Sequence, residues 1–256
     1  RRSEAEASQM DRLRDSGEEL QRALGFVDMV AFTNRSNELR ATELVRLIEV
    51  FEHTCRDIIA ANKEVDSIVL AANVRHPLVI KAVMQAAKNK NAAVLLEIAK
   101  SEATYCGANY VNIPEYALKY SAEMGHGAVF GLHVDHYAIK SPDDVLKGVP
   151  HLNSILMNGF TSVAIDASHL NDYDNFTATR SICGWLPSEL GLEVEVGEIK
   201  GAGELSTVEE ALYYIGGLNS WGIFPDYLAI SNGSLHGTYD PSAGQMEGID
   251  LGRTDR

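Results

Sequence analysis

The segment GLHVDHY, Gly131 to Tyr137, places an aspartate and a histidine side by side, shortly after an apolar run that ends at Phe130. The run has the composition of a buried strand, so we predict that Asp135 and His136 lie where the strand gives way to a loop. In that position His136 could hold a metal ion while Asp135 moves a proton. Such a motif is more often structural than catalytic, so its meaning depends on the rest of the chain.

Polar residues also follow other predicted strands, and their distribution favours a barrel. Six short apolar runs are the predicted strands: Ser67 to Ala72, Ala92 to Ile98, Gly127 to Val134, Thr161 to Asp166, Leu192 to Val196 and Asp226 to Ser231. Helical segments begin near Pro77, Pro114, Pro142, Asp172 and Thr207, which predicts a parallel sheet covered by helices. The spacing of these elements alone does not distinguish an open doubly wound sheet from a (β/α)₈ barrel. Chemical groups drawn from the ends of several strands are typical of the barrel.

Composition limits the classes of partner. The 256 residues are 45% hydrophobic, and 22 basic against 36 acidic side chains give a net charge of −14, which argues against nucleic-acid or anionic-membrane partners. Three widely spaced cysteines and a charged N-terminal segment favour a reduced, cytoplasmic, soluble protein. We predict an N-terminal helical extension over residues 1–65 and a barrel domain over residues 66–256.

Several motifs resemble those of the class II, metal-dependent fructose-bisphosphate and tagatose-bisphosphate aldolases. HVDH is similar to the family's His-x-Asp-His, and GFTSVAIDASHL to its Gly-Phe-x-Ser-x-x-x-Asp-x-Ser-His. LEVEVG is similar to its Glu-x-Glu-x-Gly, and LHGTY to its His-Gly-x-Tyr. The four motifs occur in the family's order, each after a predicted strand. The resemblance covers roughly Ser67 to Tyr239 and implies a TIM-barrel fold.

Carried across by position, the resemblance implies a zinc site. His136 and His236 match the zinc ligands, and Asp135 matches the group that exchanges a proton with the oxygen on the cleaved carbon. Asp166 and Glu195 match carboxylates that hold a second or displaced cation, divalent or monovalent. A divalent Lewis acid can hold the two oxygens of the enediolate that this cleavage leaves. The strand ends offer His and carboxylates, whereas a Schiff-base lysine could come only from Lys100 or Lys200.

The resemblance has further consequences and some departures. Gly237 matches a residue whose backbone contacts substrate phosphate. Glu204 stands in for the glutamate base of the family's mobile loop, and an equal alternative is that Glu204 caps the helix that begins near Thr207. Tyr137 replaces a usual glycine and is expected to crowd the metal mouth, and Ala99 replaces a serine near substrate phosphate. Six strand candidates are too few for a closed barrel, which has eight. We expect a longer protein whose last two β/α units lie beyond Arg256, because an open sheet would expose an apolar edge and inner face.

The resemblance therefore implies a metal-dependent aldolase. The expected reaction is cleavage of a phosphorylated ketose, fructose 1,6-bisphosphate, into dihydroxyacetone phosphate and glyceraldehyde 3-phosphate, as in glycolysis. The expected partners are the sugar phosphate and further copies of the chain, in a homo-dimer or homo-tetramer. The alternative is a non-catalytic structural or regulatory barrel, but such a relic would have little reason to retain costly buried charges.

Overall fold

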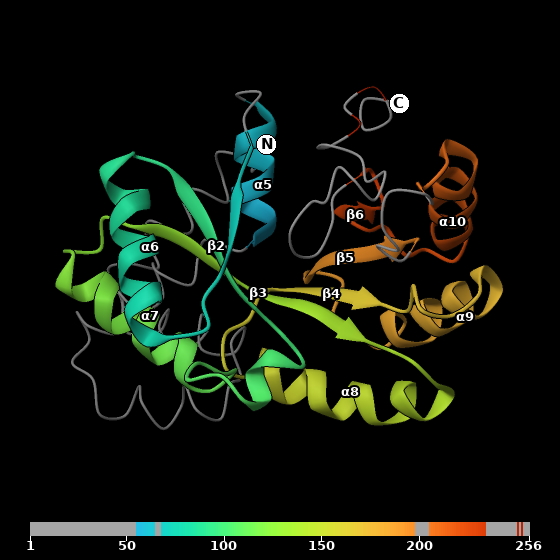
Figure 1. Ribbon diagram of the computed structural model, residues 1–256, viewed down its shortest axis with the longest axis horizontal. Coiled ribbons are helices and arrows are strands. Elements are labelled where there is room, and N and C mark those ends of the chain that lie inside the picture. The colour runs from blue at the N-terminus through green and yellow to red at the C-terminus, as the bar shows by residue number, and fades with distance from the viewer. Residues whose placement is uncertain (1–54, 65–67, 198–204, 234–249, 251, 253–256) are drawn as a thin grey trace, which may run out of the picture. The chain divides into compact units, whose positions relative to one another are not determined.

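A computed structural model describes residues 55–64, 68–197, 205–233, 250 and 252, all within one compact unit, Val50–Arg256. Six parallel strands form a curled sheet in the order β1-β2-β3-β4-β5-β6 (Figure 1). The strands are β1 (Leu70–Asn73), β2 (Ala93–Ala99), β3 (Val129–Ala138), β4 (Ser162–Asp166), β5 (Gly191–Val196) and β6 (Tyr227–Ile230). Each strand pairs with the next along the chain, and the order never reverses as it does in a doubly wound sheet. The sheet is therefore a half-barrel, consistent with part of a TIM barrel.

Helices follow the strands as the sequence pattern predicts. They are α6 (Pro77–Asn89), α7 (Asn112–Glu123), α8 (Pro142–Leu156), α9 (Asp172–Cys183) and α10 (Val208–Ser220), with a short 3₁₀ helix η1 (Glu102–Thr104) after β2. Pro77 and Pro142 each occupy the first turn, where a missing N–H leaves no hydrogen bond unmade. Thr207 and Glu210 form a reciprocal capping box at the start of α10.

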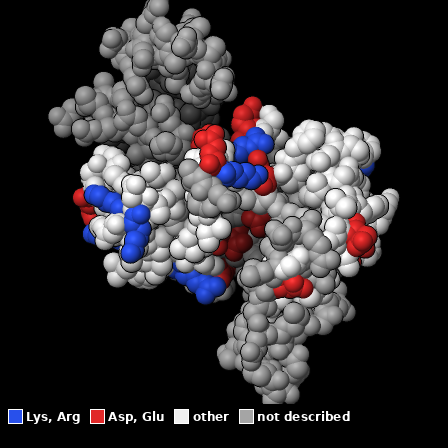
Figure 2. Space-filling view, turned by 90° about the horizontal axis from the view of Figure 1, so that it is seen from above, with Lys and Arg blue, Asp and Glu red and all other residues white. Residues whose placement is uncertain are grey.

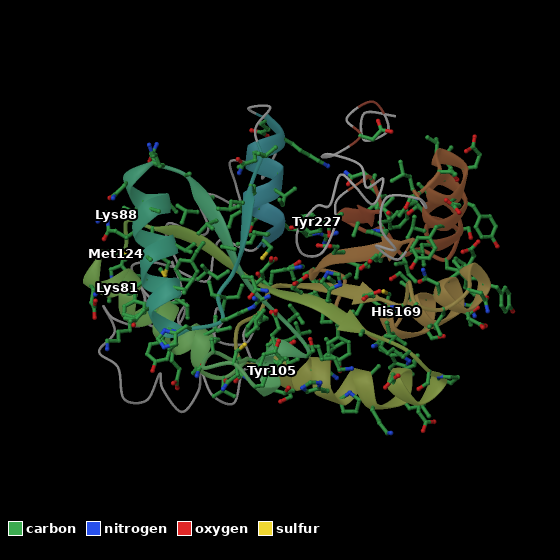
Figure 3. All side chains as sticks on the ribbon, viewed as in Figure 1. Lys81, Lys88, Tyr105, Met124, His169 and Tyr227 are labelled. Atoms are coloured by element: carbon green, nitrogen blue, oxygen red, sulfur yellow. The ribbon has the colours of Figure 1, made fainter. Side chains whose placement is uncertain are left out.

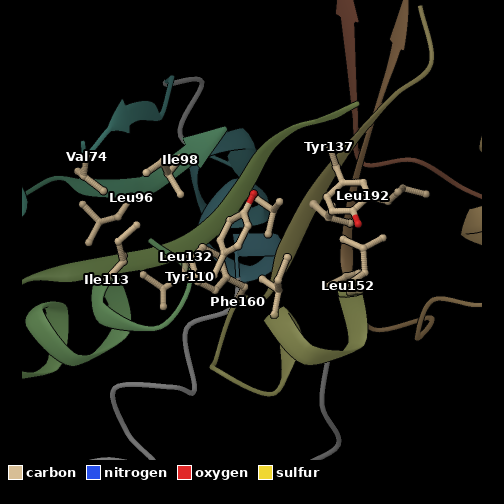
Figure 4. Close-up of a cluster of buried hydrophobic side chains, with 14 of the residues drawn as sticks. Val74, Leu96, Ile98, Tyr110, Ile113, Leu132, Tyr137, Leu152, Phe160 and Leu192 are labelled. Atoms are coloured by element: carbon tan, nitrogen blue, oxygen red, sulfur yellow. The ribbon is translucent and has the colours of Figure 1, made fainter. Parts of the chain in front are cut away.

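One face of the sheet packs on these helices and forms the main apolar core (Figure 4). Leu96 and Ile98 of β2, Val134 of β3 and Ile165 of β4 are fully buried in this layer. Because side chains alternate along a strand, the residues between them point to the opposite, inner face. In β2, β3 and β5 that face carries Glu97, His133, Glu193 and Glu195. The inner face is therefore apolar only in part: Leu95 of β2 packs against Cys55 and Ile58, and ionisable groups lie further along the strands.

A short helix, α5 (Cys55–Glu64), covers the inner face near the N-terminal ends of β2 and β3. Cys55 is fully buried, and its Sγ lies 3.4 Å from the carbonyl oxygen of Leu132. Arg56 of this helix forms a 2.8 Å ion pair with Asp226, the residue just before β6. Helix α5 packs on the sheet although it lies within the predicted N-terminal extension, residues 1–65. The boundary between residues 65 and 66 stays a prediction.

Strand β3 differs from its prediction in a way that matters for the site. It continues through Asp135 and His136 to Ala138, so these residues do not begin a loop. The pairing with β4 shifts register between Val134 and Tyr137, and His136 has φ +40°. A bulge of this kind interrupts the alternation of side chains, so that neighbouring residues can face the same side. Within the described part of the chain, no helix is both long enough and apolar enough to span a membrane.

Candidate metal centre

Three strands deliver the first cluster of ionisable groups to the inner face. His136 Nδ1 lies 3.3 Å from Asp166 Oδ2 and 3.4 Å from Glu195 Oε2. Asp166 ends β4, and Glu195 lies near the end of β5, so the carboxyl ends of neighbouring parallel strands bring the groups together. Both carboxylates are buried, whereas the side chain of His136 is 38% exposed. One nitrogen and two oxygen donors thus converge at a point that solvent can reach.

Ser168 holds the two carboxylates in place. Its N–H donates to Asp166 Oδ1 at 3.0 Å, and its Oγ lies 2.7 Å from the same oxygen and 3.3 Å from Glu195 Oε1. No role is predicted for Ser168 from the sequence, although the Asp-x-Ser spacing is typical of a turn in which a carboxylate accepts a hydrogen bond from the backbone N–H two residues on. Asn175 of α9 also donates to the carbonyl oxygen of Glu195 at 3.0 Å, which fixes the end of β5.

The charges in this cluster are strongly coupled. The pKa of His136 is raised to about 9, mainly by its hydrogen bond to Asp166. Burial acts in the opposite direction but is the smaller effect. Burial opposes ionisation of Asp166, yet hydrogen bonds from His136 and Ser168 lower its pKa to about 2. Burial and the charge of Asp166 raise the pKa of Glu195 to about 7. The protein therefore gathers more negative charge here than one imidazole balances.

This donor set fits a divalent metal ion. His136, Asp166 and Glu195 each offer a ligand atom within 4.8 Å of the others. Imidazole nitrogen and carboxylate oxygen are ordinary ligands of zinc, and a divalent ion would offset the buried carboxylates. Ser168 would then act on the carboxylates as an outer partner that orients metal ligands.

A second cluster lies beside the first on the same face. Glu97 of β2, His133 and Asp135 also offer ligand atoms within 4.8 Å of one another. His133 is 2% exposed, and its Nε2 lies 3.4 Å from Glu193 Oε2. Asp135 Oδ1 lies 3.8 Å from His136 Nε2, so Asp135 stands between the two clusters. No ligand role is predicted for His133 from the sequence, although it precedes Asp135 by two positions and therefore shares its face.

The space-filling view shows acidic side chains at the bottom of a hollow in the molecular surface (Figure 2). Burial is the main reason that the pKa of Glu97 is raised, to about 7. It is also the main reason that the pKa of Asp135 is raised.

Tyr227 of β6 lies beside this part of the face, with its ring centroid 6.4 Å from that of His133 (Figure 3). His169 lies exposed in the loop after β4 (Figure 3).

Tyr137 does not crowd the metal mouth, so that expectation is wrong. Its side chain is 1% exposed, and its hydroxyl lies 2.8 Å from His151 Nδ1 on α8, in the helix-facing core (Figure 4). Lys100 shares that side, because its Nζ lies 4.2 Å from the centre of the Tyr137 ring and donates to the carbonyl oxygen of Ala138. A Schiff base at Lys100 would therefore form away from the acidic hollow.

Four residues for which a chemical role is considered from the sequence lie outside the described residues: Lys200, Glu204, His236 and Gly237. Their roles stay predictions. The residues that the structure does describe place Asp135, His136, Asp166 and Glu195 at one site, on three neighbouring strands.

Comparison with known proteins places the chain in a family. A family described as "Fructose-bisphosphate aldolase class-II" matches residues 53–255. The fructose-bisphosphate aldolase of Streptococcus pneumoniae is 28% identical over 179 residues, covering 67% of this chain and 54% of that protein. The aldolase of Mycoplasma pneumoniae is 27% identical over 172 residues, covering 62% and 52%. The chain thus spans about half the length of these curated relatives.

Solved structures share the fold. A fructose-1,6-biphosphate aldolase structure from Coccidioides immitis superposes with a TM-score of 0.60 at 22% identity, covering 79% of this chain and 67% of the other. The fructose-bisphosphate aldolase of Campylobacter jejuni gives 0.57 at 21% identity, covering 73% and 60%. At these identities the structures support the fold alone. The family match over residues 53–255 establishes that the chain belongs to the class II fructose-bisphosphate aldolase family.

Proposed function

We propose that the protein is a zinc-dependent aldolase that cleaves fructose 1,6-bisphosphate into dihydroxyacetone phosphate and glyceraldehyde 3-phosphate. The observation that carries the proposal is the convergence of His136, Asp166 and Glu195, with Asp135 beside them. When bound, zinc supplies a Lewis acid that stabilises the enediolate left by carbon–carbon cleavage. The proposal includes a closed eight-stranded barrel, a cytoplasmic role in glycolysis, and a homo-dimer or homo-tetramer.

The residues of the chain have distinct tasks in this proposal. His136 and His236 bind the ion, with Asp166 and Glu195 as alternative or additional ligands. Asp135 takes the proton from the hydroxyl on the carbon where the bond breaks, and returns it when the reaction runs towards condensation. Burial raises the pKa of Asp135, which brings this carboxylate closer to the basicity that proton transfer near neutral pH requires.

Glu204 and Gly237 complete the proposed site from outside the described residues. Glu204 would exchange the proton on the carbon that becomes nucleophilic, and Gly237 would donate its backbone N–H to a substrate phosphate. Substituting Glu204→Gln should slow exchange of the substrate-derived proton with solvent while the ketose phosphate still binds. A variant that exchanges this proton at the wild-type rate would assign Glu204 to helix capping.

A direct experiment measures bound metal and cleavage of fructose 1,6-bisphosphate before chelation, after chelation and after zinc is restored. We expect activity to fall with chelation and to return with zinc. Glu195→Gln should weaken metal binding, while Glu189→Gln, which alters an exposed carboxylate just before the same strand, should leave it unchanged. A metal-replete protein without cleavage activity would favour the structural or regulatory barrel.

A further inference from the structure

The inner face gathers more carboxylates than one metal site uses. Five carboxylates, from Glu97, Asp135, Asp166, Glu193 and Glu195, gather around the imidazoles of His133 and His136. The basic side chains described nearby pair elsewhere, with Arg56 on Asp226 and Arg75 on Glu102. A divalent ion at His136, Asp166 and Glu195 uses two of the five carboxylates. Three carboxylates then remain around His133.

His133 is oriented as a metal ligand would be. Its Nδ1 is hydrogen-bonded to Ser162 Oγ at 2.9 Å, and the side chain is 3% exposed. Metal-binding histidines commonly use their second ring nitrogen in this way, because the bond fixes both the ring and its tautomer. With the proton on Nδ1, the lone pair of Nε2 faces Glu193 Oε2 at 3.4 Å, and a ring nitrogen of His133 lies within 4.8 Å of ligand atoms of Glu97 and Asp135.

We propose that Glu97, His133 and Asp135 bind a second divalent cation, with Glu193 beside them as a fourth donor. None of the three belongs to the cluster of His136, Asp166 and Glu195, so the two sites can be lost separately. One imidazole with two or three carboxylates suits a transition ion such as Mn²⁺ or Zn²⁺ better than Ca²⁺, which takes six to eight oxygen ligands. This site goes beyond the proposed aldolase reaction, which requires a single ion. The second cation and the proton that Asp135 takes in that reaction would compete for the same carboxylate.

The position of Asp135 relates the two ions. One of its carboxylate oxygens lies 3.8 Å from His136 Nε2, and the residue also belongs to the second cluster. Because Asp166 and Glu195 lie at His136 Nδ1 and Asp135 lies at Nε2, two bound cations would be neighbours with the His136 ring and the Asp135 carboxylate between them. A pair of Mn²⁺ ions at such a separation would broaden each other's paramagnetic resonance signals, whereas a single ion would not.

The test is the number of Mn²⁺ ions that the metal-free 256-residue chain binds, measured by equilibrium dialysis with elemental analysis and by electron paramagnetic resonance. We expect two ions per chain in the wild type, with mutual broadening of their signals. Glu97→Gln should bind one ion and lose the broadening. Glu195→Gln should weaken the other site, and Glu123→Gln, which alters an exposed carboxylate on α7, should retain both ions.

The result in the wild type needs no variant and therefore does not depend on how a variant folds. One ion per chain at saturation would overturn the proposal and assign the remaining charge balance to protons on His133 and its carboxylates. Two ions in a folded Glu97→Gln variant, checked by circular dichroism, would also overturn it. Aldol cleavage by a one-ion protein would leave the proposed function standing, so failure of this proposal and failure of the proposed function are distinguishable.

Discussion

Asp135 and His136 are adjacent in β3, yet their side chains approach to 3.8 Å on the same face of the sheet. Regular alternation would send neighbours to opposite faces, and the register shift between Val134 and Tyr137 removes that restriction. The backbone of His136 has φ +40°, a conformation that residues other than glycine rarely adopt. Backbone conformation at this one position therefore places a candidate ligand beside a candidate acid–base group.

Asp135→Ala should lower kcat by about 10²–10⁴-fold, the usual contribution of a positioned acid–base group. The ion at His136 should remain, because His136, Asp166 and Glu195 are unchanged. The measurement is steady-state cleavage of fructose 1,6-bisphosphate by protein loaded with zinc, with metal content determined on the same sample. Near-normal kcat in a zinc-loaded variant would exclude the acid–base role.

In metal-free protein His136 should be protonated at neutral pH, because hydrogen bonding to Asp166 raises its pKa to about 9. Asp166→Asn removes the negative partner and should lower this pKa towards its ordinary value of 6.5. Nuclear magnetic resonance titration of the imidazole measures the change directly. His151 is an internal control, since burial and the nearby Lys100 lower its pKa, and Asp166 plays no part. An unchanged pKa at His136 would show that Asp166 is not the dominant partner.

Much of the fold was predictable because strands, prolines and caps are local signals. Pro77 and Pro142 mark helix starts that the structure confirms. The side toward which Tyr137 points was not predictable, because it depends on the register shift in β3. His133 and Ser168 were missed for a related reason: their roles depend on carboxylates from other strands, which only the curled sheet brings near. Sequence spacing places residues on a face but does not show which groups meet across it.

Metal-free protein should lose stability as the pH rises from about 4.5 to about 7. Burial raises the pKa of Glu195 from 4.5 in its ordinary state to about 7, with the charge of Asp166 adding to the effect. Within that window the folded state holds a proton that the unfolded chain releases, so the free energy of unfolding falls with rising pH. Glu195→Gln should reduce this slope, and Glu189→Gln should not. Denaturant unfolding at several pH values, with chelator present, measures the change in the free energy of unfolding with pH. Equal slopes in the wild type and in Glu195→Gln would contradict a raised pKa at Glu195.

Gly131→Ala should destabilise the docking of α5 on the inner face. A Cβ at Gly131 would lie 2.6 Å from Cys55 Sγ and 3.1 Å from Leu95 Cδ2, so the helix or the strand must move. Overpacking of this kind typically costs about 1–3 kcal/mol. Cys55→Ala removes the clashing sulfur, so the double variant Gly131→Ala/Cys55→Ala should recover part of the loss caused by Gly131→Ala. Denaturant unfolding of the wild type, both single variants and the double variant gives the coupling free energy. Additive effects would mean that Gly131 and Cys55 do not meet, and that α5 does not pack against β3 at this point.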